Sequence, residues 1–312
     1  MTTTSKDSTM TTPRGAWPVM LTPFHDDLSI DLEALDRYTD WLVEQGAAGL
    51  FPVALSGEMY DLTEEERLLV ARRVVERAAG RVPVLASSVE FGDAAALAES
   101  VRRMAATGVD AVVLIASVLL GEGDDESLLR EKVSAVIAAN PGVALGIYEC
   151  PLPHHAVLSL DTVAWLAQQG PFVFFKETSH DVAEMGRRVD VAASSRMRVF
   201  NAGIESLVES LDVGTAGLSG WVVNVYPELV QWLAGHGSAS SPEAVRLQAA
   251  LDAVERTMAP SYPASAKRLV ALRSGIDFGL AGRWKPGQQV DEAELRGLIA
   301  EVSLIAGEVV GA

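Results

Sequence analysis

The feature that most constrains the fold is a regular alternation between short apolar runs and longer amphipathic stretches. Each apolar run spans four to six residues, which is typical of a buried strand. We expect eight strands, near Trp17–Leu21, Gly49–Val53, Val84–Ser87, Ala111–Ala116, Ala144–Tyr148, Phe172–Lys176, Arg198–Asn201 and Gly214–Ser219. Eight strands that alternate with helices predict a (β/α)8 TIM barrel of the α/β class. The alternative, an open doubly wound sheet, usually has fewer strands and a G-x-G-x-x-G turn, which this sequence lacks.

Helical periodicity fills the segments between these runs. Thr63 and Glu66 form a capping box at the start of one helix, and Gly46 is a stop signal after another. The predicted helices are Asp31–Gln45, Thr63–Ala79, Ala94–Ala106, Glu126–Ala139, Leu160–Gln169 and Asp181–Ala193.

After Ser219 the alternation ends, and helices follow one another without strands between them. These helices are predicted at Pro227–Gly235, Pro242–Met258, Ser265–Ser274 and Asp291–Glu308. We therefore interpret residues 15–224 as the barrel and residues 225–312 as a small C-terminal helical region. Residues 1–14 are polar and rich in Thr and Ser, which predicts a disordered tail.

Charge and composition exclude several classes of protein. Acidic residues outnumber basic ones 42 to 25, which argues against nucleic-acid binding. No apolar run approaches the ~20 residues of a membrane span, and the N-terminus has no apolar signal core. Cys150 is the only cysteine, and no Cys/His cluster has metal-ligand spacing. We expect a cytoplasmic protein without membrane partner or metal.

A lysine stands at the end of the sixth predicted strand, where Lys176 follows four apolar residues in "PFVFFKETSH". An ordinary strand-end lysine reaches into water or pairs with a carboxylate. In a barrel, however, the carboxyl ends of all strands open onto the active-site mouth. Tyr148 ends the fifth strand, and the segments Ala54–Glu58 and Gly217–Trp221 follow the second and eighth. This convergence favours a functional role for Lys176.

The chemistry available to such a group is Schiff-base formation. A lysine in a dry pocket has a lowered pKa, so its neutral amine can attack a carbonyl carbon. Tyr148 can transfer protons to and from the intermediate, although a packed aromatic residue is the ordinary interpretation. The Leu-Ser-Gly stretch can hold a carboxylate through backbone N–H groups and the Ser56 hydroxyl, although it also fits a simple strand-to-helix turn.

Four motifs in this order resemble those of the dihydrodipicolinate synthase/N-acetylneuraminate lyase family of class I aldolases and dehydratases. They are "ALSGE" followed by "LTEEER", "YECP", "FFKETS" and "GLSGWVVNVYP", and the resemblance extends from about Gly15 to the C-terminus. It implies that Lys176 is the Schiff-base lysine and Tyr148 the proton-transferring tyrosine. It also implies that Ser56 and Gly57 hold the carboxylate of pyruvate or a related 2-oxo acid. Members are commonly homotetramers and use no redox cofactor, so we expect a homo-oligomer, tetramer or dimer.

The sequence also departs from the family pattern. The first hydroxyl of G-[ST]-T-G-E is Leu55, and the tyrosine pair after the fourth strand is replaced by Val118 and Leu119. The arginine that the lysine-pathway synthases place after Y-N-x-P aligns near Pro153. A true dihydrodipicolinate synthase is therefore not expected, and the pocket is predicted to be more apolar than usual.

Further residues of the predicted mouth are candidate substrate contacts. Leu55, Ser219 and Glu205 join Ser56 and Gly57 in this set. The sugar-acid lyases of the family place acidic residues after the seventh strand; this sequence keeps Glu205 there but has Ile204 beside it, so sialic acid is not the expected substrate. The loop histidines His154, His155 and His180 are further candidates, with simple solvation as the alternative.

Two functional hypotheses remain open. The first is a Schiff-base lyase that acts on a 2-oxo acid, as an aldolase or as a dehydratase. The second is a non-catalytic barrel that binds a carboxylate, which the missing hydroxyl at Leu55 would permit.

Overall fold

The computed structural model describes residues 10–311, in which eight parallel strands form one sheet. The sheet order is β1-β8-β7-β6-β5-β4-β3-β2. The strands are β1 (Gly15–Ala16), β2 (Leu50–Val53), β3 (Val84–Ser87), β4 (Ala111–Ile115), β5 (Leu145–Tyr148), β6 (Phe172–Glu177), β7 (Arg198–Asn201) and β8 (Gly217–Leu218). All eight coincide with or adjoin the predicted apolar runs, and the predicted TIM barrel is confirmed.

The first predicted strand differs most from the structure. β1 ends at Ala16, and the segment after it continues alongside β2 through irregular hydrogen bonds. The N–H of Phe51 donates to the carbonyl of Pro18 at 3.0 Å, and the N–H of Met20 donates to the carbonyl of Phe51 at 3.0 Å. Pro18 has no N–H to donate, which interrupts the regular ladder. These bonds join the two edges of the sheet. β8 is likewise shorter than predicted.

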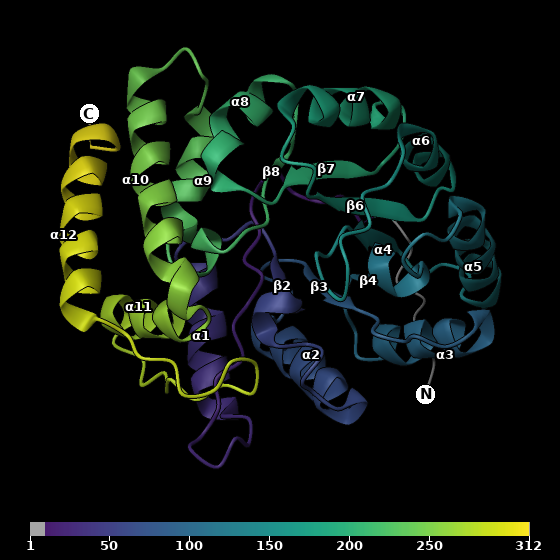
Figure 1. Cartoon of the computed structure of the whole chain (residues 1–312), viewed down its shortest axis with the longest axis horizontal. Helices are drawn as coiled ribbons and strands as arrows, with labels where there is room; N and C mark the ends of the chain where they lie inside the picture. The colour runs from purple at the N-terminus through teal and green to yellow at the C-terminus, as the bar shows by residue number, and fades with distance from the viewer. Residues whose placement is uncertain (1–9, 312) are drawn as a thin grey trace.

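Helices surround the sheet, as Figure 1 shows. The barrel helices are α1 (Leu32–Glu44), α2 (Glu64–Ala78), α3 (Ala94–Ala105), α4 (Ala116–Leu119), α5 (Glu126–Ala139), α6 (Leu160–Gln168), α7 (Val182–Ala192) and α8 (Leu207–Asp212). The capping box of Thr63 and Glu66 is confirmed at the start of α2. The short helices α4 and α8 were not predicted from the sequence.

The C-terminal helices lie together on one side of the barrel (Figure 1). They are α9 (Pro227–His236), α10 (Pro242–Met258), α11 (Ala264–Ser274) and α12 (Glu292–Val309). The division between barrel and C-terminal region at residue 224 stays a prediction. Among residues 10–311, no helix combines the length and apolar character that crossing a bilayer requires.

The predicted disordered tail is only partly within the described residues, since residues 1–9 lie outside them. The remaining part packs on the barrel. The Thr12 hydroxyl is buried and donates to the carbonyl of Val173 at 2.7 Å, and Arg14 donates to the carbonyl of Thr215 at 2.6 Å. Ordered structure therefore begins before the predicted boundary at residue 15.

Aromatic side chains fill the barrel beneath its mouth. Phe174 of β6 and Phe200 of β7 stack with ring centroids 4.7 Å apart, and Trp17 lies 5.3 Å from Phe174. Phe51 of β2 lies 6.1 Å from Phe174 and 6.3 Å from the ring of Tyr148. This layer closes the barrel from below, so a polar group above the layer can face only the mouth.

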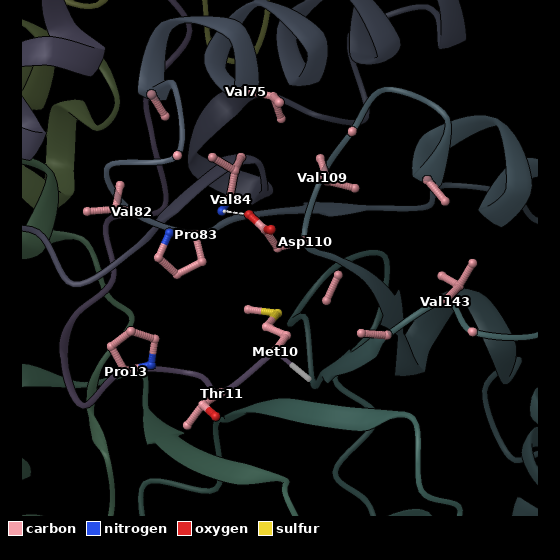
Figure 2. A pocket seen from close by; sticks show the side chains of 17 residues that line it. Met10, Thr11, Pro13, Val75, Val82, Pro83, Val84, Val109, Asp110 and Val143 are labelled. Atoms are coloured by element: carbon pink, nitrogen blue, oxygen red, sulfur yellow. Dashed lines mark hydrogen bonds between the residues drawn. The ribbon is translucent and has the colours of Figure 1, made fainter. Parts of the chain in front are cut away.

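A cavity of about 710 Å³ lies at the amino-terminal ends of β3, β4 and β5. Val84, Asp110 and Ala144 line it, and Met10 of the N-terminal segment projects toward it (Figure 2). The Asp110 carboxylate accepts from the N–H of Val84 at 2.9 Å there. Catalytic groups of a TIM barrel gather at the opposite, carboxyl ends of the strands. This cavity is therefore distinct from the barrel mouth.

Candidate active site

The side chain of Lys176 points into the barrel because of its place in β6. Successive residues of a strand face opposite sides. Phe174 lies in the interior aromatic layer, so Lys176, two residues later, faces inward as well. Phe175 faces outward, where the guanidinium of Arg188 on α7 lies 5.4 Å from its ring centroid. The structure therefore places Lys176 in the mouth, directly above the aromatic layer.

The Lys176 amine sits in a dry environment. The residue is 4% exposed, and its Nζ lies 4.6 Å from the centroid of the Tyr148 ring. No carboxylate among residues 10–311 forms an ion pair with this amine, so its charge has no close partner. Burial lowers the pKa of Lys176 to about 8, and the neighbouring acidic groups of Cys150, Glu255 and Glu177 offset only part of this effect.

Tyr148 is the direct neighbour of Lys176 in the sheet, since the two residues pair in register between β5 and β6. The tyrosine is 3% exposed, and burial raises the pKa of its hydroxyl well above 10. Cys150, two residues on, is fully buried as well. Tyr148 is therefore a protonated phenol beside an amine that loses its proton readily.

Ser56 and Gly57 lie in the single 3-10 turn η1 (Leu55–Gly57) that follows β2. The Ser56 hydroxyl is buried, and Tyr262 is the side chain that approaches it. The N–H of Gly57 already donates to the carbonyl of Ala54 at 3.0 Å. A Cβ at Gly57 would meet the carbonyl oxygen of Pro52 at 2.5 Å, so only glycine fits there. Of this pair, Ser56 is the better placed to contact a ligand.

Two more buried hydroxyls lie at strand ends. Ser219 directly follows β8, and Ser87 is the last residue of β3. Among the described residues, neither hydroxyl oxygen has a hydrogen-bond partner. Buried polar atoms are nearly always paired, so these two oxygens are available for a hydrogen bond with a ligand. Ser219 was expected from the sequence, whereas Ser87 was not.

The outer rim carries Glu205 in η2 (Ile204–Ser206) and His180 in the loop after β6. His180 Nδ1 and Glu205 Oε1 lie 2.7 Å apart, and both side chains are about half exposed. The contact raises the pKa of His180 and lowers that of Glu205. His155 Nε2 lies 2.7 Å from the hydroxyl of Thr178. The structure thus groups His155, His180 and Glu205 at the rim.

With this geometry established, comparison with known proteins decides the family. A model of the dihydrodipicolinate synthetase family matches residues 12–275. The chain belongs to this family. An uncharacterized DapA-like lyase of Halobacterium salinarum is 31% identical over 299 residues, with 93% of this chain and 94% of that protein covered. A 4-hydroxy-tetrahydrodipicolinate synthase of Methanothrix thermoacetophila is 28% identical over 95% of this chain and 99% of its own.

Solved structures of dihydrodipicolinate synthetase family members share the fold. A dihydrodipicolinate synthase of Bacillus anthracis superposes with a TM-score of 0.83 at 22% identity, over 95% of this chain and 99% of that one. The Escherichia coli K12 protein YagE, solved in complex with pyruvate, gives a TM-score of 0.77 at 21% identity, over 94% and 98% of the two chains.

The positions at which the family resemblance led us to expect polar groups are occupied by apolar residues. Leu55 lies in η1 between β2 and Ser56, and Val118 and Leu119 are buried in α4. Pro153 lies exposed in the loop after β5. That these residues replace hydroxyl, phenol and guanidinium groups of relatives stays a prediction.

A buried ionic network behind the site was missed by sequence reasoning. Arg188 of α7 is fully buried and donates to Glu149 at 3.0 Å and to Glu177 at 2.6 Å. Each carboxylate follows a site residue, Tyr148 or Lys176, and faces outward because the site residue faces inward. The network ties the ends of β5 and β6 together. The sequence did contain a signal for this network: an acidic residue directly follows each of the two strand-end site residues, and an arginine lies on the helix after β6.

Glu255 of α10 is the second missed residue. Its Oε1 accepts from the N–H of Val222, just after β8, at 2.8 Å. Burial raises the pKa of Glu255 to about 7, and its charge interacts with those of Lys176 and Glu205. A C-terminal helix thus brings a carboxyl group toward the mouth. The sequence held no signal for it, because Glu255 resembles any acidic residue of an amphipathic helix.

Proposed function

We propose that this protein is a class I lyase, in which Lys176 forms a Schiff base with pyruvate or a related 2-oxo acid. The observation that carries the proposal is the unpaired, buried amine of Lys176 beside the ring of Tyr148. A charged amine in such a place costs free energy, and a purely structural role would not explain that cost. The pyruvate complex of the E. coli protein with this fold supports the substrate class.

The first chemical step joins the Lys176 nitrogen to the carbonyl carbon of the substrate. The neutral amine attacks, and Tyr148 donates its phenolic proton to the resulting hydroxyl group, which leaves as water. The iminium formed draws electrons from the adjacent carbon. Cleavage of the C3–C4 bond then yields an enamine and an aldehyde, with the Tyr148 oxygen accepting the proton of the C4 hydroxyl. Tyr148 then returns this proton to C3 of the enamine, which becomes an iminium again. Water adds to the iminium and gives a proton back to the Tyr148 oxygen, so pyruvate is released and both side chains are restored.

Buried hydroxyls supply the polar contacts for the substrate. Ser56 and Ser219 are suited to the carboxylate of the 2-oxo acid, since each is buried in the mouth at the end of a strand. Glu205 and His180 at the rim are suited to hydroxyl groups farther along the substrate. Leu55, Val118 and Leu119 favour a partner with an apolar portion. The same three positions argue against the lysine-pathway synthase reaction.

The assembly remains part of the proposal. A homo-oligomer, dimer or tetramer, is expected from the family resemblance, although one solved structure of this fold is that of a monomeric dihydrodipicolinate synthase variant. A cytoplasmic location stays an expectation from the sequence.

Product analysis tests the proposal and separates its two chemical forms. The purified protein is incubated with a panel of 2-oxo-3-deoxy acids that carry apolar or hydroxylated tails. An aldolase gives pyruvate and an aldehyde, whereas a dehydratase gives an oxo acid one water lighter. Lys176→Met is expected to abolish turnover, and Tyr148→Phe to lower kcat by about 10²–10⁴-fold. A wild-type protein that binds these acids without converting any of them would indicate the non-catalytic barrel instead.

A further inference from the structure

We propose that His155 is a specificity-determining residue, whose ring nitrogen Nδ1 accepts a hydrogen bond from a hydroxyl group of the substrate beyond C4. The inference rests on the proposed function, in which C2 of the substrate is bonded to Lys176 and Tyr148 acts at C4. It names the substrate class, which is 2-oxo-3-deoxy acids with a hydroxylated tail. The place of His155 above Lys176, the direction of its hydrogen bond and the anchoring of its loop all support this role.

Thr178 brings His155 to the side of the mouth that lies above Lys176. Phe174 and Lys176 face the barrel interior, and inward residues of a strand stand two apart, so Thr178, directly after β6, is next on this face. Glu177 between them faces the outer side of the sheet. His155 Nε2 lies 2.7 Å from the hydroxyl oxygen of Thr178. A substrate that is bonded to Lys176 and extends out of the mouth on this side therefore meets His155.

The hydrogen bond between His155 and Thr178 has only one possible direction. The Thr178 hydroxyl has a single proton, which it donates to the backbone carbonyl of Glu149 at 2.8 Å. Toward His155 the hydroxyl oxygen can only accept, so Nε2 of the imidazole carries the hydrogen. In a neutral imidazole, the other nitrogen then keeps its lone pair. Nδ1 of His155 is thus a hydrogen-bond acceptor.

The two rim histidines differ in protonation, and His155 is the one that favours the neutral form. Burial lowers the pKa of His155, and the charge of His180 acts in the same direction. His180 Nδ1 instead lies 2.7 Å from the Glu205 carboxylate, which raises the pKa of His180. A neutral acceptor bonds with a hydroxyl group, but it has no hydrogen to offer the oxygen atoms of a carboxylate or phosphate. Nδ1 of His155 therefore selects a hydroxyl group at this position.

The loop that carries His155 is held on both sides of this residue. Near its start, the carbonyl of Leu152 accepts from the hydroxyl of Tyr60 at 2.7 Å. Near its end, the N–H of Leu158 donates to the buried carboxylate of Glu149 at 2.8 Å. His155 lies midway in sequence between these two contacts, so its imidazole is held in position before a substrate binds.

The kinetic test uses three acids of equal length, 4-hydroxy-2-oxohexanoate and its 5-hydroxy and 6-hydroxy derivatives. For at least one derivative, the wild type should show a kcat/KM about tenfold higher than for the parent acid, because one hydrogen bond is gained. His155→Phe removes the acceptor, so this ratio should fall to about twofold or less. A purely structural effect of the substitution would lower kcat/KM for all three acids and leave the ratio unchanged.

Two further variants show whether the hydrogen bond itself is responsible. His155→Gln keeps a donor toward Thr178 and an acceptor on the other atom of its amide, so it should recover much of the ratio. His236→Phe is the matched control, because His236 is an exposed histidine at the end of α9 whose Nδ1 lies 3.0 Å from the carbonyl oxygen of Trp232. Its ratio should equal that of the wild type.

The tautomer of His155 is a readout that is independent of turnover. Long-range 1H–15N NMR spectra of the protein with 15N-labelled histidine distinguish the two neutral tautomers and the cation. Among the five histidines, His155 is identified by the signals that His155→Phe lacks. At about pH 7.5 it should carry its hydrogen on Nε2, and Thr178→Val should mix the two tautomers. A wild-type His155 with its hydrogen on Nδ1 would overturn the inference.

The outcomes separate this inference from the proposed function. A wild type that converts the three acids with equal kcat/KM, or an unchanged ratio in His155→Phe, would overturn the specificity role of His155 alone. A wild type that converts none of these acids and none of the wider panel would overturn the proposed function, and the specificity role with it.

Discussion

Single residues decide the chemistry of this molecule, and Lys176 is the most informative of them. The Lys176 amine is 4% exposed and has no ion-pair partner within residues 10–311, so its charged form has lost its hydration. Its pKa falls to about 8 for that reason, chiefly by desolvation. Lys267 is equally buried but pairs with Glu58 at 2.8 Å, so it is held as a structural cation. Burial lowers the pKa of Lys267 too, but its ion pair with Glu58 opposes the shift, whereas Lys176, the proposed nucleophile, has no such ion pair within residues 10–311.

The dependence of catalysis on pH follows from the lowered pKa of Lys176. Only the neutral amine attacks a carbonyl, and its fraction grows as pH rises through about 8. We expect kcat/KM to increase toward a plateau above that pH, because kcat/KM reports groups of the free enzyme. A pH–rate profile whose ascending limb lies near pH 10.5, the ordinary value for lysine, would contradict a dry site.

The lowered pKa of Lys176 should also make the free energy of unfolding depend on pH. The folded pKa of about 8 lies below the unfolded one, so the unfolded chain binds more protons between the two values. The free-energy cost of burying the charged Lys176 amine is complete below about pH 8 and disappears as the pH rises toward about 10.5. Lys176→Met should therefore stabilise the protein at pH 7 by on the order of 1–3 kcal/mol, less as the pH rises. Urea unfolding at several pH values measures this, and a destabilised variant at pH 7 would count against it.

At the scale of secondary-structure elements, contacts on the outward face of the sheet hold the strands that carry the site residues. β5 and β6 carry Tyr148 and Lys176 inward, and the next residue of each strand meets Arg188 of α7 outside. The two carboxylates share one guanidinium, and burial raises the pKa of Glu149 to about 7. The network therefore fixes the two strand ends that carry the proposed catalytic pair.

Removing the shared cation should be costly. Arg188→Met leaves Glu149 and Glu177 buried without their counter-charge, and we expect a loss of about 3–5 kcal/mol in the free energy of unfolding. Arg187→Met is the matched control, because Arg187 is 54% exposed and pairs with Glu184 at the surface. Urea unfolding should find the control within about 1 kcal/mol of the wild type. Equal effects of the two substitutions would refute a structural role for the network.

Strands and helices were predictable where one local pattern decides them. The capping box at Thr63 and the apolar run before Lys176 are signals of this kind. The first strand was placed wrongly because Pro18 interrupts a ladder that the apolar pattern alone suggests. Glu255 could not be found at all, since its approach to the site depends on how distant segments pack.

At the scale of the whole molecule, the motif residues after β2 hold the C-terminal segment in place. Glu58 accepts from Lys267 of α11 and from the backbone N–H groups of Arg283 and Trp284, at 2.6–2.8 Å. Glu66 of α2 accepts twice from the guanidinium of Arg283 at 2.7 Å. Two acidic residues of the family motif thus join the barrel to residues more than two hundred positions later.

Neutralising Glu58 should loosen this junction. Glu58→Gln leaves Lys267 buried without its counter-charge, so we expect a loss of about 3–5 kcal/mol and faster hydrogen exchange at the amides of Arg283 and Trp284. Glu66→Gln, at a partly exposed ion pair, should cost about 1 kcal/mol or less. Hydrogen exchange with mass spectrometry resolves the segment. Unchanged protection there in Glu58→Gln would show that other contacts hold it.

Trapping of the Schiff base tests the central claim most directly. The protein is incubated with pyruvate at pH 8, reduced with sodium borohydride and mapped by peptide mass spectrometry. We predict one pyruvate-derived adduct on the peptide that contains Lys176, none on the peptide that contains the equally buried Lys267, and no adduct in Lys176→Met. An adduct on Lys267 instead of Lys176, or no adduct with pyruvate and a panel of 2-oxo acids, would contradict the account.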